Sequence, residues 1–94
     1  DFCLPNGIVI ESKGIFVSDD RKKHLLIRDQ FPELDIRFVF HSKSTKIRKG
    51  SKTTVCMWAA KNDFLYADKL IPEEWMREKV NRKSLGVIQK IRGS

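Results

Sequence analysis

Cysteine is scarce in this 94-residue chain, and long apolar runs are absent from it. The two cysteines, Cys3 and Cys56, lack the spacing of a metal site and do not suggest a disulfide framework, so reduced thiols in a cytoplasmic protein are expected. No apolar run approaches the ~20 residues that span a bilayer, and the start shows no signal-peptide pattern. We therefore expect a cytoplasmic protein without a membrane partner.

Basic residues are in excess, because 19 Lys and Arg against 12 Asp and Glu give a net charge of +7. This excess indicates a polyanionic partner and says little about the fold, while the length allows one small domain. Residues 41–52 contain no acid, and their interleaved hydroxyl groups suit phosphate oxygens, although a flexible, soluble loop would have the same composition. A charged run on the preceding helix is usually just a solvated face, although its first basic residues could contact a DNA backbone. The candidate DNA contacts on this helix and in the loop are Arg21, Lys22, Lys43, Lys46, Arg48, Lys49 and Lys52.

The first fourteen residues predict a β-hairpin, because two apolar runs flank the turn Pro5-Asn6-Gly7. With Gly7 in the left-handed conformation, Leu4 faces Ile8 and Asp1 faces Glu11. Side chains alternate along each strand, so one face is apolar and the other carries Asp1, Glu11 and Lys13.

The carboxylates on that second face predict a cation site. Side chains directly opposite in a hairpin lie about 5 Å apart at Cβ, and Mg²⁺ is commonly held by one or two carboxylates plus a substrate phosphate. The Ser12 carbonyl could add a ligand, and Lys13 could then stabilise a phosphoryl transition state. On spacing alone, however, an edge hairpin with solvated charges is favoured over a cation site, because carboxylate-x-Lys is a common pattern. A different register would also separate Asp1 from Glu11.

The middle of the chain predicts a βαβ unit. A helix over residues 19–30, capped by Ser18 and buried through Leu25, Leu26 and Phe31, precedes a strand over residues 35–40, which should run parallel to the strand that carries Glu11. The sheet would then be mixed.

The rest of the chain predicts two further short elements and a tail. A helix capped by Thr53 or Ser51 buries Trp58 as core, a strand covers residues 64–67, and Pro72 opens another helix at its first position. We divide the chain into a core, residues 1–78, and a basic C-terminal tail, residues 79–94. This tail is either an amphipathic helix, docked or lying on DNA, or a partly ordered segment.

Asp1 followed by Glu11-x-Lys13 resembles the PD-(D/E)xK nuclease motif, without its proline. Longer segments extend the resemblance to the phage endonuclease I family of Holliday-junction-resolving enzymes, over roughly residues 1–78. These segments are Ser18–Arg28, Pro32–Arg37, Thr45-Lys46, Lys49-Gly50 and Ala67–Trp75.

This resemblance implies a restriction-endonuclease-like α/β fold, with a mixed β-sheet flanked by helices. It implies that Asp1, Glu11 and Ser12 bind Mg²⁺, for which Mn²⁺ can substitute, and that Lys13 is catalytic. It further implies a phage protein in the host cytoplasm that cleaves branched DNA as a homodimer, with an exchanged N-terminal segment supplying another active-site Glu.

The chain begins at the motif aspartate, so we expect it to lack that segment and its Glu, and to be a fragment. Two other functions remain open on the sequence alone. One is a non-catalytic DNA-binding module of the same fold, and the other is a site-specific or mismatch-specific nuclease of the homing or repair type.

Overall fold

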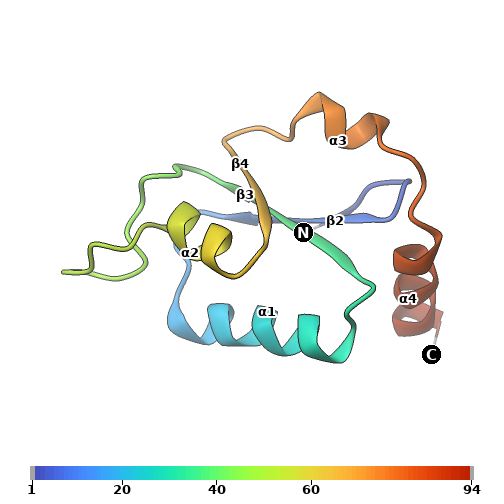
Figure 1. The fold of residues 1–94 in the computed structure, drawn as a ribbon, viewed down its shortest axis with the longest axis horizontal. Coiled ribbons are helices and arrows are strands. Elements are labelled where there is room, and N and C mark those ends of the chain that lie inside the picture. The colour runs from blue at the N-terminus through green and yellow to red at the C-terminus, as the bar shows by residue number, and fades with distance from the viewer. Residues whose placement is uncertain (1, 94) are drawn as a thin grey trace.

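The computed structural model describes residues 2–93 of the chain, with side chains from Cys3 to Arg92. Strands and helices alternate through most of this length (Figure 1). In order, they are β1 (Phe2–Cys3), β2 (Ile8–Lys13), α1 (Ser18–Gln30), β3 (Asp35–Phe40), α2 (Val55–Lys61), β4 (Leu65–Asp68), α3 (Glu73–Arg77) and α4 (Arg82–Gly93).

The predicted hairpin and its register are confirmed over the described residues. Phe2 pairs with Ile10, Cys3 pairs with Val9, and the Leu4 amide donates to the Ile8 carbonyl at 2.8 Å. Gly7 has φ +94°, a conformation that glycine adopts without the strain of a Cβ. This residue is also tightly covered, because a Cβ here would lie 2.8 Å from the Asn81 carbonyl oxygen.

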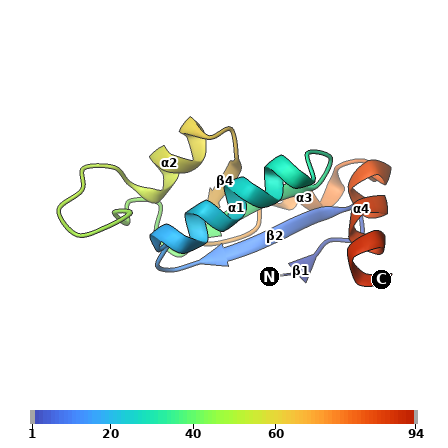
Figure 2. The same ribbon diagram turned by 90° about the horizontal axis from the view of Figure 1, so that it is seen from below.

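The described strands form one mixed sheet in the order β1-β2-β3-β4. The β1–β2 pair is antiparallel, whereas β2–β3 and β3–β4 are parallel, so the predicted βαβ unit is confirmed. Helices α1 and α2 cover one face of the sheet, and α3 lies over the other (Figures 1 and 2). The structure is therefore the expected α/β fold, a mixed sheet flanked by helices and consistent with a nuclease-like architecture.

Each face of the sheet has its own hydrophobic core. Under α1 and α2 the core is aromatic, and Phe16 meets the edge of Trp58 at a ring-centroid distance of 4.9 Å, which confirms Trp58 as a core residue. Under α3 the core consists of Leu4, Ile8, Ile10, Val39 and Trp75. The strand β2 is thus covered on both sides, which fixes the direction in which each of its side chains points.

Two predictions about helix α1 are wrong. Leu26 is 61% exposed, and the buried position of the helix belongs to His24 instead. The helix also begins one residue early, so that Val17 occupies the N-cap position, and within residues 2–93 no side chain caps it. Tertiary packing rotates the helix so that the aromatic core receives His24.

Three shorter corrections concern the elements after β3. The side chain that caps α2 is Thr54, which accepts the Met57 amide at 3.2 Å, and neither Thr53 nor Ser51 does so. The strand β4 is shifted one residue along, and Pro72 is the N-cap of α3, not its first residue. The Pro72 carbonyl accepts the first hydrogen bond of α3 from the Trp75 amide at 3.0 Å, and after β4 the Lys69 amide donates to the Phe40 carbonyl at 2.7 Å.

For residues 79–93 the structure shows the docked-helix alternative. Helix α4 packs against the hairpin turn, with Ser84 fully buried and Ile88 9% exposed. None of the helices in residues 2–93 has the length and apolar character needed to cross a membrane.

Candidate active site

Glu11 and Lys13 lie side by side on β2. They are two residues apart on one strand, so both side chains point to the α1 face of the sheet. Lys13 Nζ lies 3.9 Å from Glu11 Oε2, and the two side chains are 12% and 15% exposed. The structure therefore brings together the two described members of the predicted catalytic set.

Asp20 is a third member of this cluster that the sequence analysis missed. It lies in the first turn of α1, where its Oδ2 accepts a hydrogen bond from Lys13 Nζ at 3.3 Å, while Lys23 Nζ lies 3.4 Å from its Oδ1. Desolvation raises the pKa of Asp20, but the hydrogen bonds and charges of Lys13 and Lys23 outweigh it, so the pKa lies below its ordinary value. The sequence signal that could have indicated Asp20 is the short connection from β2 to α1, because it keeps the first turn of the helix close to the end of the strand.

One carboxylate oxygen in this cluster lacks a hydrogen bond. Glu11 Oε2 is buried, and no donor among the described residues bonds to it. Because a buried charged oxygen loses its hydration, it needs a cation or a donor in compensation, and Lys13 at 3.9 Å supplies only charge. A hard oxygen donor of this kind fits a divalent cation such as Mg²⁺.

The remaining predicted metal ligands are less well defined. Asp1 lies outside the described residues, and Ser12 lies between Glu11 and Lys13 with its Oγ 3.4 Å from His41 Nε2. Across residues 2–93 no three or more His, Cys, Asp or Glu side chains are grouped closely enough to hold a metal ion. Of the two described carboxylates in the cluster, Asp20 is paired with Lys13 and Lys23, so Glu11 is the one that could serve a cation, and Mg²⁺ sites commonly use one or two carboxylates.

His24 lies beneath this cluster and is fully buried. Its ring meets Phe38 edge-on at a centroid distance of 5.0 Å, and neither ring nitrogen finds a partner within the described chain. Desolvation, reinforced by the charges of Lys13 and Lys23, lowers its pKa from 6.5 to about 4. The imidazole is therefore neutral at physiological pH and forms part of the aromatic core.

The basic loop between β3 and α2 is anchored at both ends. Its backbone pairs with the residues before α2, with Ile47 donating to Thr53 at 3.0 Å, and the Lys43 amide donates to Asp68 Oδ1 at 2.8 Å. All five cations predicted to contact DNA in this loop are exposed. They are Lys43, Lys46, Arg48, Lys49 and Lys52.

Arg21 and Lys22, the two predicted DNA contacts on α1, differ in their surroundings. Lys22 is exposed, whereas Arg21 Nη1 donates to the carbonyls of Phe16 at 2.5 Å and of Ile47 at 3.0 Å. Arg21 therefore ties the basic loop to α1 and to the segment that joins β2 to α1. A DNA contact by either residue stays a prediction.

Three comparisons connect this arrangement with known proteins. The family model described as phage endonuclease I matches residues 1–94. Endonuclease I of Escherichia phage T7 is 60% identical over 78 residues, which is 83% of this chain and 52% of that protein. Endodeoxyribonuclease 1 of Enterobacteria phage T3 is 60% identical over 78 residues, which is 83% of this chain and 51% of that protein. The chain spans about half the length of these curated relatives. Because the family model covers the whole sequence, the chain belongs to the phage endonuclease I family.

Proposed function

We propose that this chain is the catalytic part of a metal-dependent, structure-selective endodeoxyribonuclease that hydrolyses phosphodiesters in branched DNA such as four-way junctions. The observation that carries the proposal is the Glu11–Lys13 pair, in which a buried carboxylate oxygen of Glu11 has no hydrogen-bond donor among the described residues. Both residues belong to the C-terminal half of β2, and that end of β2 lies on the same side of the molecule as the exposed basic loop (Figures 1 and 2). The names of the two relatives, an endonuclease and an endodeoxyribonuclease, agree with this function.

Each group of the cluster receives a role. Glu11, Asp1 and the Ser12 carbonyl would hold Mg²⁺ or Mn²⁺, and the described register, with Phe2 opposite Ile10, is the one this assignment requires. The bound cation would supply positive charge at the scissile phosphate. Lys13 orients the nucleophilic water and stabilises the charge that develops on the phosphoryl oxygens, with Asp20 holding its ammonium group in place. The basic loop and Lys22 contact phosphates flanking the cut.

Two parts of the proposal concern the longer relatives and rest on family resemblance alone. In a full-length form we propose a homodimer whose exchanged N-terminal segment completes the site with another Glu. We also propose action in the cytoplasm of the phage-infected host cell.

The test compares a labelled four-way junction with a linear duplex of the same sequence, with and without Mg²⁺. We expect cuts near the branch point of the junction, only with Mg²⁺. Binding without incision would instead favour a non-catalytic DNA-binding module. Equal cutting of the linear duplex would favour a site-specific or mismatch-specific nuclease.

Lys13→Ala tests the assigned chemistry. We expect cutting to fall by about 100-fold or more, which is the typical loss when one transition-state donor is removed, while junction binding is retained. The matched control is Lys61→Ala, an exposed lysine on α2 that should cut at the rate of the unchanged chain. Cutting that survives Lys13→Ala would contradict the mechanism.

A further inference from the structure

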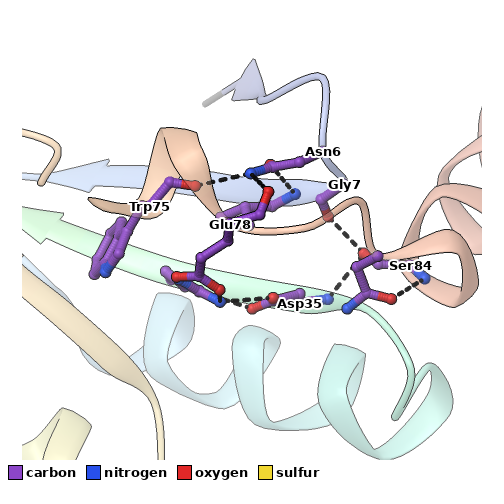
Figure 3. A network of polar contacts seen from close by, with 9 residues as sticks. Asn6, Gly7, Asp35, Trp75, Glu78 and Ser84 are labelled. Carbon is purple, nitrogen blue, oxygen red and sulfur yellow. Dashed lines mark hydrogen bonds and ion pairs between the residues drawn. The ribbon is translucent and has the colours of Figure 1, made fainter. Parts of the chain in front are cut away.

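Helix α4 is fixed to the core by a buried serine. Ser84 Oγ donates to the Gly7 carbonyl at 2.6 Å and accepts the Asp35 amide at 3.0 Å (Figure 3). One side chain thereby joins α4 to the hairpin turn and to the start of β3. Because these buried hydrogen bonds join three segments through one side chain, they set both the position and the rotation of the helix.

The segment before α4 is held in the same way. Asn6 Nδ2 donates to the carbonyls of Trp75 and Glu78 (Figure 3). The Asn81 amide donates to the Asn6 carbonyl at 2.7 Å. Glu78, which follows α3, also forms an ion pair with Arg37 of β3, at 2.5 Å between Arg37 Nη1 and Glu78 Oε2. The helix therefore presents its outer face at a fixed place on the molecule.

This outer face is strongly basic. At about 100° per residue, Arg82, Lys83, Gly86 and Lys90 occupy an arc of roughly 100° on the side opposite Ser84. All four are exposed, and they border a shallow groove of about 270 Å³ whose other wall carries Glu33. Residues 79–94 contain five basic residues and no acid.

Gly86 in this arc has no intramolecular explanation. Apart from its chain neighbours and the backbone of its own helix, a Cβ built there meets no atom of the described residues within 4 Å, and glycine weakens a helix interior relative to alanine. The missing side chain leaves the helix backbone accessible between the cations. Such access suits a partner that approaches closely from outside.

The basic face lies far from the basic loop. The molecule measures 41 × 28 × 19 Å, and α4 and the loop between β3 and α2 lie at opposite ends of its long axis (Figures 1 and 2). A duplex advances about 34 Å per helical turn, so one DNA substrate is long enough to reach both ends.

We propose that the exposed face of α4, formed by Arg82, Lys83, Gly86 and Lys90, is a second contact surface for the phosphate backbone of duplex DNA. The inference rests on the proposed function only in taking DNA as the polyanion. Closely spaced cations around an accessible backbone fit successive phosphates. A membrane surface fits less well, because a helix that binds lipid inserts its apolar side, and here Ile88 on that side is buried in the protein.

The test measures the salt dependence of duplex and junction binding without Mg²⁺. Lys83→Gln/Lys90→Gln removes two charges from the proposed surface, and Lys61→Gln/Arg77→Gln removes two exposed charges elsewhere, so both variants have a net charge of +5 after starting from +7. We expect the slope of log K against log[salt] to shrink by about 1.8 for the first pair, because each phosphate contact contributes about 0.9. The control pair should keep the original slope, and equal slopes for the two pairs would overturn the proposal.

Gly86→Leu provides an independent variant that leaves charge unchanged. We expect thermal stability to be retained, since the Cβ meets open space, and DNA affinity to fall at least threefold because the backbone can no longer be approached. Unchanged DNA affinity, or binding of anionic lipid vesicles that competes with DNA through the same residues, would overturn the assignment.

These results separate the two proposals. A slope change on Lys83→Gln/Lys90→Gln in a chain that never cuts DNA would retain the α4 surface and reject the nuclease. Cutting that depends on Lys13, combined with an unchanged salt slope in the α4 variant, would retain the nuclease and reject the α4 surface.

Discussion

At the scale of single residues, the site depends on where one ammonium group is held. Lys13 Nζ lies 3.3 Å from Asp20 and 3.9 Å from Glu11, so the closer contact is to the helix and not to the neighbouring residue of its own strand. Asp20 thus holds Lys13 near Glu11, while Glu11 Oε2 has no hydrogen-bond donor among the described residues.

Asp20→Asn tests this positioning role. We expect the cutting rate to fall by about tenfold with DNA binding and melting temperature nearly unchanged, because the pair is partly exposed and contributes little to stability. The measurement is a single-turnover cleavage rate beside a thermal unfolding curve. Asp19→Asn is the matched control, since Asp19 is an exposed carboxylate in the same helical turn. Equal losses in the two variants would refute a specific role for Asp20.

The sequence allowed prediction of the residues on β2 but not of Asp20 or His24. Glu11 and Lys13 follow from strand alternation, which is a local rule. Asp20 has a sufficient local explanation as an acid in the first turn of a helix, and the short connection from β2 to α1 is the one local feature that places this turn near the end of the strand. The complete burial of His24 depends on how α1 is rotated by its contacts with the sheet.

At the scale of elements, the hydrogen bonds of Ser84 connect three segments that are distant in sequence. The serine is fully buried, and its hydroxyl serves both the Gly7 carbonyl and the Asp35 amide. Glu78 stabilises the same region through its hydrogen bond from Arg37, and this bond lowers the pKa of the Glu78 carboxyl group. Docking of α4 should therefore contribute to the stability of the whole hairpin.

Ser84→Ala should lower the free energy of unfolding by about 1–3 kcal/mol, since it leaves a buried carbonyl and an amide without their partner. Denaturant unfolding measures this loss, and limited proteolysis should show earlier cleavage within α4. The control is Ser18→Ala at an exposed position of α1, where we expect a change within about 0.5 kcal/mol. A loss no larger than in the control would show that docking does not depend on this serine.

The helices and strands themselves were largely predictable, whereas their exact ends and the contacts between them were not. The strand over residues 35–40 and the core position of Trp58 follow from apolar periodicity. The capping of α2 by Thr54 instead of Thr53 reflects the bridge between Thr54 and Lys46, and therefore the loop geometry. The position of α4 could not be predicted, because Ser84, which bonds it to the hairpin turn and to β3, is a polar residue that apolar periodicity does not mark as buried.

At the scale of the whole molecule, acid stability should depend on the buried imidazole of His24. Its ring packs against Phe16 and Phe38, which join α1 to the sheet, so a charge there would act on the entire core. The nearby charges of Lys13 and Lys23 add repulsion to the cost of desolvating the imidazolium. Protonation of His24 should therefore favour global unfolding over a local rearrangement.

The pH range of this effect follows from the two states of the histidine. In the folded protein the pKa is about 4, and in the unfolded chain it returns to about 6.5, so between these values the unfolded state binds more protons. Stability must then fall as the pH is lowered from 6.5 toward 4, by up to about 3 kcal/mol, and no such contribution exists above pH 7. Asp20 and Glu78, whose pKa values are lowered, lose their stabilising contributions mainly below about pH 4.5.

Denaturant unfolding of the unchanged chain, His24→Phe and His41→Phe between pH 4.5 and 7 tests this prediction. His24→Phe changes packing and hence absolute stability, so the informative quantity is the slope of the unfolding free energy with pH. That slope should become nearly flat in His24→Phe, because the titrating group is gone, and should persist in His41→Phe, whose histidine is exposed. If the slope survives in His24→Phe, the imidazole is not the proton acceptor that couples acid to unfolding, and another group whose protonation differs between the folded and unfolded states must carry it.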